Sequence, residues 1–310
     1  MSEATTAAVT ARTGLPALIV AMRPYQWPKN LIVFAALIFS AGDAWEPGDF
    51  DSWWPLLWRT VALFGLWSLV SSATYLLNDV RDRTTDALHP RKRRRPIASG
   101  AVSPRTAITT AILLTVIALP LAAAIDIVAG AVLAGYAVIM AAYSFGLKNV
   151  AIMDILILCT GVVGRAVGGA AALDVEISPW LYVCSSFGAF FFAVSKRWSE
   201  FRQLGEVAAR HRPALQNYTG ELLNQMLVIS AAGAVLSYAL YTIESNRVPT
   251  DGSMALTLPF AAFAMLRYLL LLDGPRKTEA PDRILFTDPQ IILAAIGFTI
   301  TALAVLVAHR

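Results

Sequence analysis

VALFGLWSLVSSATYLLNDVRDRTTDALHPRKRRRPIASG, residues 61–100, joins a long apolar run to a polar segment in which three carboxylates precede a block of arginines. The apolar run is as long as a helix that crosses a bilayer. Similar runs recur along the 310 residues, of which 57% are hydrophobic and only 15% are charged. Soluble proteins carry about 25% charged residues, so we expect an integral membrane protein.

We predict nine transmembrane helices within a single all-α domain that covers residues 1–310. Residues 1–16 are polar and small, without the apolar core of a signal peptide, and we expect them to be a flexible cytoplasmic N-terminus. The polar loops after the second, sixth and eighth spans are expected to form a cytoplasmic cap. The predicted spans are residues 26–42, 56–79, 104–123, 126–146, 150–172, 179–196, 222–243, 254–272 and 289–308.

Charge predicts the orientation, because basic residues next to a membrane select the cytoplasmic side. Of the 25 lysines and arginines, 20 fall in the N-terminal segment or in the stretches 81–105, 148, 196–212 and 276–283. The intervening loops GDAWEPGDFD, IDI, DVEIS and ESNRVPTDG are acidic, with a single arginine. We therefore expect a plasma-membrane protein with its N-terminus inside and its C-terminus outside.

The acidic cluster closes the second span. If the helix continues past the membrane, Asp79, Asp82 and Asp86 lie on one face with Asn78 beside them. Crowded carboxylates repel one another unless a cation neutralises them, and oxygen ligands suit Mg²⁺. We predict a Mg²⁺ site here; the alternative is a solvated helix end paired with Arg81 and Arg83.

The basic block 91–95 follows at once. Pro90 and Pro96 stiffen a turn that is expected to bring this block back toward the carboxylates. Basic residues beside a span also set topology and bind anionic phospholipid, and this alternative stays open for each of them. A nucleic-acid partner is not expected, because the sequence offers neither a soluble fold nor a stacking surface.

Two stretches resemble a known family. NDxxDxxxD followed by HPxKRxRPIASG closely resembles the first signature of the UbiA superfamily of intramembrane prenyltransferases. RPYQWPKN, residues 23–30, is similar to the segment that opens the first helix of that superfamily. The resemblance covers nearly the whole chain. It implies a nine-helix bundle with a cytoplasmic active site and Mg²⁺-dependent transfer in which diphosphate leaves.

The chain departs from the superfamily after the sixth span. Most members carry a second aspartate cluster there, but this chain reads KRWSEFRQLGE, with Lys196, Glu200 and Gln203 on one helical face and Arg197 adjacent. Cationic side chains suit direct binding of phosphate, which predicts a donor with more phosphate groups, such as phosphoribosyl diphosphate (PRPP).

This basic pattern, and TEAPDRILFTD at residues 278–288, resemble the branch of the superfamily that transfers phosphoribose to decaprenyl phosphate for actinobacterial cell-wall arabinan. The resemblance implies that PRPP is the donor and that decaprenyl (polyprenyl) phosphate is the acceptor. The lipid phosphate is already anionic, so its attack on the ribose carbon, with inversion, needs no dedicated general base. Positioning and electrostatics would supply most of the acceleration.

The candidate site residues are assigned by role. Asp79, Asp82 and Asp86 are the catalytic and metal-binding carboxylates. Residues predicted to bind PRPP are Asn78, Arg91, Lys92, Arg95, Tyr143, Lys148, Lys196, Arg197 and Glu200. Residues predicted to bind the lipid phosphate are Gln26, Lys29, Asn30 and Arg165.

Simpler roles remain open for several of these residues. Tyr143 and Lys148 suit an interfacial aromatic and a topology-setting lysine, and Lys29 can extend its amine to the membrane surface. Arg165, in the middle of a span, should be paired or face a cavity, and Asp154 offers only a loose partner. For the whole protein, the alternatives are a prenyltransferase that uses an isoprenoid diphosphate with an aromatic acceptor, or a transporter. The oligomeric state, a trimer included, is left open.

Overall fold

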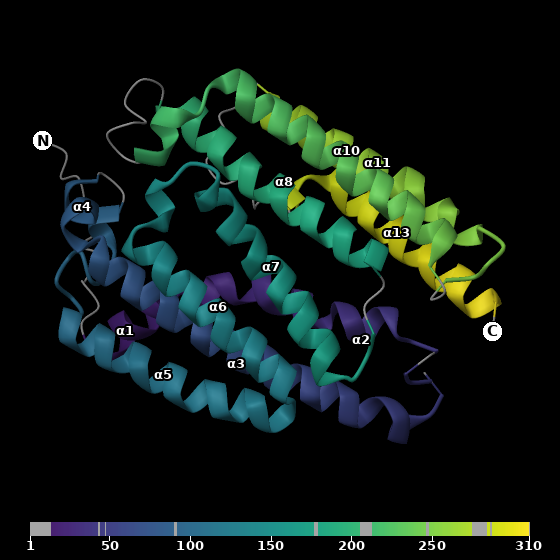
Figure 1. The fold of residues 1–310 in the computed structure, drawn as a ribbon, viewed down its shortest axis with the longest axis horizontal. Coiled ribbons are helices and arrows are strands. Elements are labelled where there is room, and N and C mark those ends of the chain that lie inside the picture. Colours follow the sequence, from purple (N-terminus) through teal and green to yellow (C-terminus); the bar gives the residue numbers. More distant parts are fainter. Residues whose placement is uncertain are drawn as a thin grey trace, which may run out of the picture. The chain divides into compact units, whose positions relative to one another are not determined.

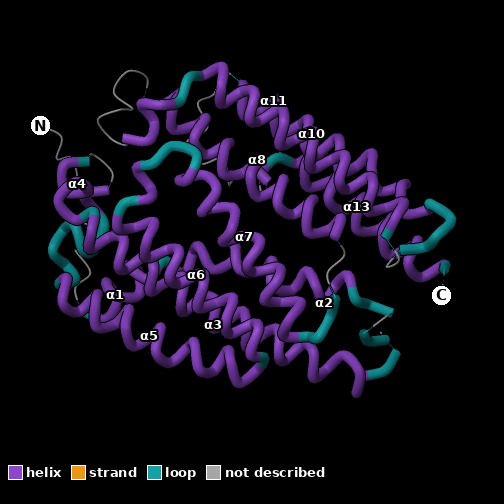
Figure 2. The backbone as a smooth tube through the Cα atoms, in the orientation of Figure 1, coloured by secondary structure: helices purple, strands orange, loops and turns teal. Residues whose placement is uncertain are grey.

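A computed structural model describes residues 14–42, 44–46, 48–89, 92–176, 179–204, 213–245, 248–274, 284–285 and 287–309. The regular elements of these residues are helices, apart from one isolated bridge between Ala41 and Trp45 (Figure 2). The chain forms two compact units: an N-terminal unit of residues 1–31 and 64–145, and a C-terminal unit of residues 32–63 and 146–310. The prediction of a single domain stays a prediction.

The N-terminal unit is held together by small side chains. Ala17 and Ala21 of α1 pack with Ala73 of α3 and with Ala107 and Ala111 of α5 in one buried cluster. Ile97 and Val102 join this cluster, so the loop after the basic block is anchored to the helices. The elements of the unit are α1 (Leu15–Met22), most of η1 (Pro24–Phe34), α3 (Phe50–Arg81) from residue 64, α4 (Arg83–Leu88), η2 (Lys92–Arg94), α5 (Pro104–Ile125) and α6 (Ile127–Phe145) (Figure 1).

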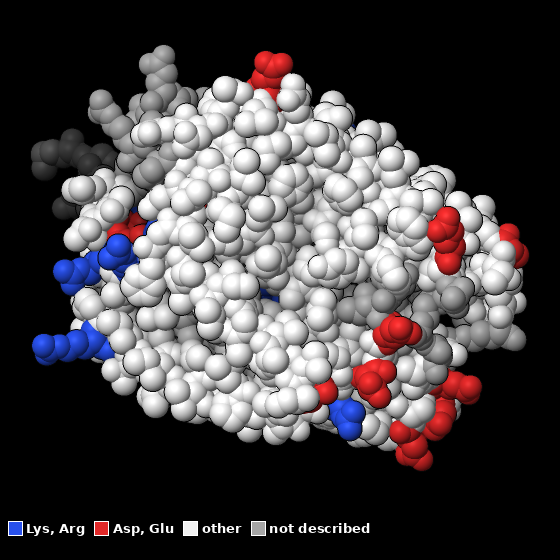
Figure 3. Space-filling view, viewed as in Figure 1, with Lys and Arg blue, Asp and Glu red and all other residues white. Residues whose placement is uncertain are grey.

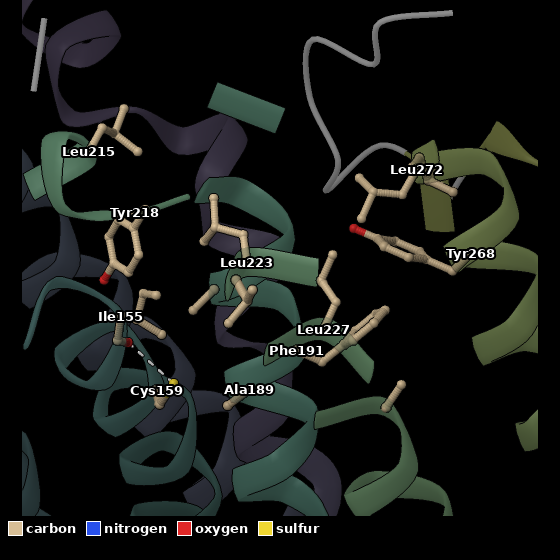
Figure 4. Packing of buried hydrophobic residues seen from close by; sticks show 14 of the residues in the cluster. Ile155, Cys159, Ala189, Phe191, Leu215, Tyr218, Leu223, Leu227, Tyr268 and Leu272 are labelled. Carbon is tan, nitrogen blue, oxygen red and sulfur yellow. Dashed lines mark hydrogen bonds between the residues drawn. The ribbon is translucent and has the colours of Figure 1, made fainter. Parts of the chain in front are cut away.

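The C-terminal unit has a larger and more aromatic core. Phe191 packs edge-on against Tyr268, with ring centroids 5.1 Å apart. Leu223 and Leu227 of α10 lie in the same buried cluster, which Figure 4 shows together with Tyr218. The elements of the unit are the end of η1 from residue 32, α2 (Ala35–Phe39), the start of α3, η3 (Leu147–Asn149), α7 (Met153–Ala172), α8 (Pro179–Leu204), η5 (Pro213–Asn217), α10 (Gly220–Glu244), η6 (Ser253–Thr257), α11 (Leu258–Asp273) and α13 (Pro289–Ala308).

Seven helices of the described residues are long and apolar enough to cross a membrane, which confirms the all-helical membrane fold. They match seven predicted spans: α3, α5, α6, α7, α10, η6 with α11, and α13. Predicted span 26–42 instead forms η1 and the short α2; Pro28 lies inside η1 and has no N–H to donate. Helix α8, which contains the predicted span 179–196, is 26 residues long, but its last turns carry the charged residues Lys196, Arg197, Glu200 and Arg202. It is not among the seven.

Charged residues collect at opposite ends of the helices within each unit. Helix α5 follows the basic block and has Asp126 as its C-cap, and α7 follows Lys148 and ends two residues before Asp174. Between these ends the surface is largely uncharged, as the face drawn in Figure 3 shows. Apolar side chains such as Leu113 (55% exposed) and Leu236 (64% exposed) lie on it, which is the surface that lipid would cover.

Gly169 marks a close backbone approach within the C-terminal unit. A Cβ at this position on α7 would overlap the carbonyl oxygen of Val33 in η1 and press on its Cα. Both neighbours are backbone atoms, so neither can turn aside as a side chain could. The contact therefore requires glycine.

We expect Gly169→Ala to destabilise the protein by about 1–3 kcal/mol, the usual cost of overpacking. Gly188→Ala on α8 is the matched control, because a Cβ there meets nothing within 4 Å. Thermal unfolding of both variants in detergent measures the difference. Equal melting temperatures would contradict the close approach of Val33 to Gly169.

Candidate functional site

The acidic cluster lies where α3 ends and α4 begins. The continuous helix predicted through residue 86 is corrected: α3 ends at Arg81, and Asp82 is the N-cap of α4, with φ −89° and ψ 4°. The backbone stays close to helical there, since Asp82 N donates to Asn78 O and Asp86 N donates to Asp82 O. Asp79 and Asp86 are buried, with 2% and 3% exposure. Asp82 is half-buried and accepts a hydrogen bond from Asn78 Nδ2 at 3.2 Å.

Arg95 joins the two buried carboxylates. Its Nη1 lies 3.1 Å from Asp79 Oδ1 and 2.6 Å from Asp86 Oδ2. Because one nitrogen reaches both, the two carboxylates lie on the same side of the helix break. The expected return of the basic block toward the acids is thus confirmed for Arg95, through a turn in which Arg93 N donates to His89 O and Arg95 N donates to Lys92 O.

Arg23 is a second cationic partner of the cluster. Its Nη2 lies 2.5 Å from Asp79 Oδ1 and 2.7 Å from Oδ2, and its guanidinium stands 5.0 Å from the ring centre of Tyr75. Burial would lower the pKa of Arg23, but the charge and hydrogen bonds of Asp79 outweigh this effect and raise the pKa above its usual value. The alternative interpretation of the sequence pairs the acids with Arg81 and Arg83. In the structure Asp79 pairs with Arg23 and Arg95, and Asp86 pairs with Arg95.

The donor set of this cluster fits Mg²⁺ in its chemistry. Three carboxylates and one amide of residues 78–86 supply the hard oxygen atoms that Mg²⁺ prefers. The arrangement of the described residues contains no group of three His, Cys, Asp or Glu side chains set to hold a metal. Arginines neutralise Asp79 and Asp86 instead, so metal binding requires their guanidinium groups to move.

The other predicted donor-binding residues of this unit have different surroundings. Lys92 is exposed in η2, and Tyr143 is 9% exposed near the end of α6. Arg91 and Pro90 lie outside the described residues. The role of each in donor binding stays a prediction.

The predicted lipid-phosphate residues of η1 divide into exposed and buried side chains. Lys29 is exposed and Gln26 is half-buried. Asn30 is 1% exposed, donates to Ser68 Oγ at 2.9 Å and accepts from Ser71 Oγ at 3.5 Å. Together with Trp27, whose indole donates to Ser72 Oγ at 3.0 Å, Asn30 fastens η1 to α3.

A buried charged network lies in the C-terminal unit. Arg197 and Asp154 are both fully buried, and Arg197 Nε lies 2.5 Å from Asp154 Oδ2. Arg197 Nη1 also contacts Glu200 Oε2 at 2.7 Å. Tyr218 donates to Asp154 Oδ1 at 2.8 Å and accepts from the backbone N–H of Ile152 at 2.5 Å. Burial raises the pKa of Tyr218 to about 12, so the phenol keeps the proton that it donates.

This network positions the predicted basic face of α8. The helix continues to Leu204, as the spacing of Lys196, Glu200 and Gln203 requires. Lys196 is exposed, and the Glu200 side chain is 30% exposed, so both are reachable from outside the helix packing. Arg197 faces inward, and its contact with Glu200 holds one oxygen of that carboxylate.

Two further predicted residues lie in the C-terminal unit. Lys148, in η3, is half-buried. Arg165 is 8% exposed and donates through Nη1 to Gly161 O, one turn earlier on α7. Asp154, considered as its loose partner, pairs with Arg197 instead. A small cavity of about 70 Å³ lies nearby, between α2, α7 and α8, and its lining is mainly apolar, with Ala166, Val167 and Phe39 among its residues.

Comparison with known proteins defines the family. The profile of the UbiA prenyltransferase family matches residues 31–288. The chain belongs to the UbiA prenyltransferase family. The resemblance seen in the first signature is thereby confirmed.

The relatives of this UbiA chain include decaprenyl-phosphate phosphoribosyltransferases. The enzyme of Mycolicibacterium smegmatis is 34% identical over 281 residues, which cover 86% of this chain and 87% of the relative. That of Mycobacterium tuberculosis is 33% identical over 284 residues, or 92% of each chain. That of Corynebacterium glutamicum is 32% identical over 289 residues, or 91% of this chain and 84% of the relative.

Solved UbiA structures share the fold. A UbiA homolog from Archaeoglobus fulgidus bound to GPP and Mg²⁺ superposes with a TM-score of 0.69 at 21% identity, covering 93% of this chain and 99% of that one. A digeranylgeranylglyceryl phosphate synthase structure gives 0.65 at 16% identity, with 95% and 98% coverage. At these identities the likeness establishes the fold.

Sequence reasoning missed three residues of these networks. Arg23 opens the RPYQWPKN segment but is not among the candidate site residues of the sequence. The sequence offers Asp154 only as a loose partner for Arg165 on the same helix, whereas its partner in the structure is Arg197 on α8. No sequence signal marks Tyr218, which approaches Asp154 from 64 residues away.

We expect Asp154→Asn to destabilise this UbiA protein by about 3–5 kcal/mol, because the buried Arg197 would lose the negative charge of its fully buried carboxylate partner. Tyr218→Phe should lower the free energy of unfolding by less, about 1–3 kcal/mol, because the Ile152 N–H and the Asp154 carboxylate would each lose a hydrogen bond. Tyr182→Phe, which alters an exposed tyrosine of α8, is the control. Chemical denaturation in detergent measures the free energy of unfolding of all three variants. If Tyr218→Phe lowers it no more than the control does, the hydrogen bonds of Tyr218 in this network are contradicted.

Proposed function

We propose that this chain is a membrane phosphoribosyltransferase that moves 5-phosphoribose from PRPP to decaprenyl phosphate, releasing diphosphate. The proposal rests on relatives of that name that are 32–34% identical over most of the chain. The observation that carries it in the structure is the cluster of Asp79, Asp86, Arg23 and Arg95 at the family signature. It combines oxygen ligands for a metal with guanidinium ligands for phosphate.

In the N-terminal unit, Asp79, Asp82 and Asp86, with Asn78, are proposed to hold Mg²⁺. When bound there, Mg²⁺ would offset the charge that grows on the leaving diphosphate. Arg95 and Lys92 offer guanidinium and ammonium groups to the donor phosphates. Roles for Arg91 and Tyr143 in donor binding are part of the same proposal.

In the C-terminal unit, the exposed Lys196 is proposed to bind a phosphate of the donor directly. Arg197 acts through Glu200, since its own guanidinium is fully buried against Asp154. A role for the partly exposed Glu200 carboxylate in donor binding is part of the same proposal. Lys148, half-buried in η3, is a further proposed phosphate ligand.

The lipid phosphate is proposed to bind Lys29 and Gln26 of η1, whose side chains are at least partly exposed. Asn30 supports them by fastening η1 to α3. Arg165 is a proposed second cation for this phosphate, although its Gly161 contact gives it a local partner as well.

The residues of this chain then have defined tasks in the transfer. Cationic side chains hold the donor while the bond between its ribose carbon and the diphosphate oxygen breaks. A lipid phosphate oxygen forms the new bond to the same carbon, with inversion. That oxygen is anionic at neutral pH, so no side chain has to remove a proton. Orientation and preorganised charge supply the acceleration.

The basic ends of both units are proposed to face the cytoplasm, following the excess of lysine and arginine there. The acidic ends, around Asp126 and Asp174, would then face outward. PRPP would thus be bound at the cytoplasmic surface.

We expect purified protein to convert radiolabelled PRPP and decaprenyl phosphate into labelled lipid, and EDTA to abolish the reaction. Asp82→Ala should be inactive yet membrane-inserted, whereas Glu221→Ala, which removes an exposed carboxylate of α10, should keep wild-type activity. Turnover only with an isoprenoid diphosphate and an aromatic acceptor would identify a prenyltransferase. Flux across proteoliposomes without product would identify a transporter.

Lys196→Ala should raise the KM for PRPP by about 10-fold to 100-fold, the equivalent of one hydrogen bond to a charged group. The KM for decaprenyl phosphate should stay unchanged. Arg105→Ala, which removes an exposed cation from the first turn of α5, is the matched control. Equal KM values in the two variants would remove Lys196 from the donor site.

A further inference from the structure

The Asp79–Asp86 pair carries no spare negative charge in this structure. Two buried carboxylates face two guanidinium groups, with every N–O separation between 2.5 and 3.1 Å. A buried carboxylate needs such compensation, because moving it out of water is costly. A divalent cation added to this cluster would meet two positive charges whose carboxylates are already satisfied.

The two arginines are not equally free to move. Arg23 is 15% exposed, binds Asp79 through both carboxylate oxygens and stacks on Tyr75. The Arg95 side chain is 27% exposed and reaches the carboxylates through a single nitrogen, Nη1. It follows the three-residue η2 in a surface turn. Arg95 is therefore the partner that can leave.

A phosphate-bearing donor offers Arg95 an alternative partner. A guanidinium group can bind phosphate through two parallel hydrogen bonds from two nitrogens. In the present structure Arg95 contacts the carboxylates through one nitrogen only. When Arg95 turns to a phosphate, Asp79 keeps only Arg23 and Asp86 keeps neither arginine. Asp79, Asp86 and Arg23 then carry one net negative charge, and the two carboxylates can accept a divalent cation.

We propose that Arg95 keeps divalent cations off Asp79 and Asp86 until a diphosphate group arrives, and then exchanges the carboxylates for that diphosphate. Metal binding and diphosphate binding are thereby coupled, and the coupling is reciprocal. This inference rests on the proposed function, in that the ligand which releases Arg95 is the diphosphate of the donor.

The exchange makes Arg95→Gln change two affinities in opposite directions. Without phosphate present, the variant should bind Mn²⁺, used as a spectroscopic probe for Mg²⁺, about tenfold more tightly than wild type, within the usual range of site coupling. With saturating Mg²⁺, it should bind radiolabelled diphosphate about tenfold more weakly, for loss of one charge-assisted contact. A purely structural arginine, whose removal disorders the loop, would weaken both.

Mn²⁺ binding to the full-length protein in nanodiscs is followed by electron paramagnetic resonance, and diphosphate binding by scintillation proximity. Arg94→Gln is the matched control: it removes the same charge from the neighbouring exposed position of η2 and should leave both affinities within about twofold of wild type. If Arg95→Gln fails to fold, Arg95→Lys replaces it. Lysine keeps the charge and can contact the carboxylates through one nitrogen, but it lacks the two-pronged fork, so diphosphate binding should weaken while Mn²⁺ binding stays within about twofold of wild type. Weaker binding of both ligands would again indicate a purely structural arginine.

Weaker or unchanged Mn²⁺ binding by Arg95→Gln, or an equal gain by Arg94→Gln, overturns the proposal. The transferase assay separates its fate from that of the proposed function. If the wild-type protein makes labelled lipid but Arg95→Gln binds Mn²⁺ more weakly, the proposed exchange is wrong and the proposed function is supported. If Arg95→Gln shifts the Mn²⁺ and diphosphate affinities in opposite directions but the wild-type protein uses only isoprenoid diphosphates, the exchange is supported and the phosphoribosyltransferase assignment is wrong.

Discussion

Buried carboxylates in contact with arginines are the constraint on which both units depend. A carboxylate removed from water needs a positive charge or several hydrogen-bond donors within contact distance. Asp79, Asp86 and Asp154 are 3% exposed or less, and each is met by arginine. These pairs determine where the surrounding segments lie: the 92–95 turn returns to α3 and α4, and the C-terminal part of α8 is fixed against the start of α7.

The two sets of ion pairs differ in accessibility, and this difference separates a supporting role from a functional one. Asp154 and Arg197 are fully buried, with Tyr218 and Glu200 completing their hydrogen bonds. Water and ligands do not reach such a pair, so it holds the helix in place. Arg95 is partly exposed above Asp79 and Asp86. Its partner can be exchanged, which a site for polyanionic ligands needs.

The apolar surface and the small-residue core follow from the membrane environment. Lipid is as apolar as leucine, so burial of leucine against a neighbouring helix gains little, and close packing has to supply the contact energy. Alanines at the core of the N-terminal unit and Gly169 beside Val33 meet this need. Many large aliphatic side chains, such as Leu113 and Leu236, are exposed on the helix surfaces. Charged groups gather at the helix ends.

Sequence by itself determined the helical membrane class, seven of the spans, the family signature and the acidic and basic segments, because hydrophobic length and a dense motif are local properties. It also predicted that the basic block returns to the acids, since prolines flank the block. Tertiary structure decided the partners: Arg23 reaches Asp79 across 56 residues, and Asp154 takes Arg197 rather than Arg165. It also converted the expected first span into η1 and a short helix. Pairing of buried charges depends on which side chains the packing brings within a few ångströms, and periodicity along one helix carries no information about that.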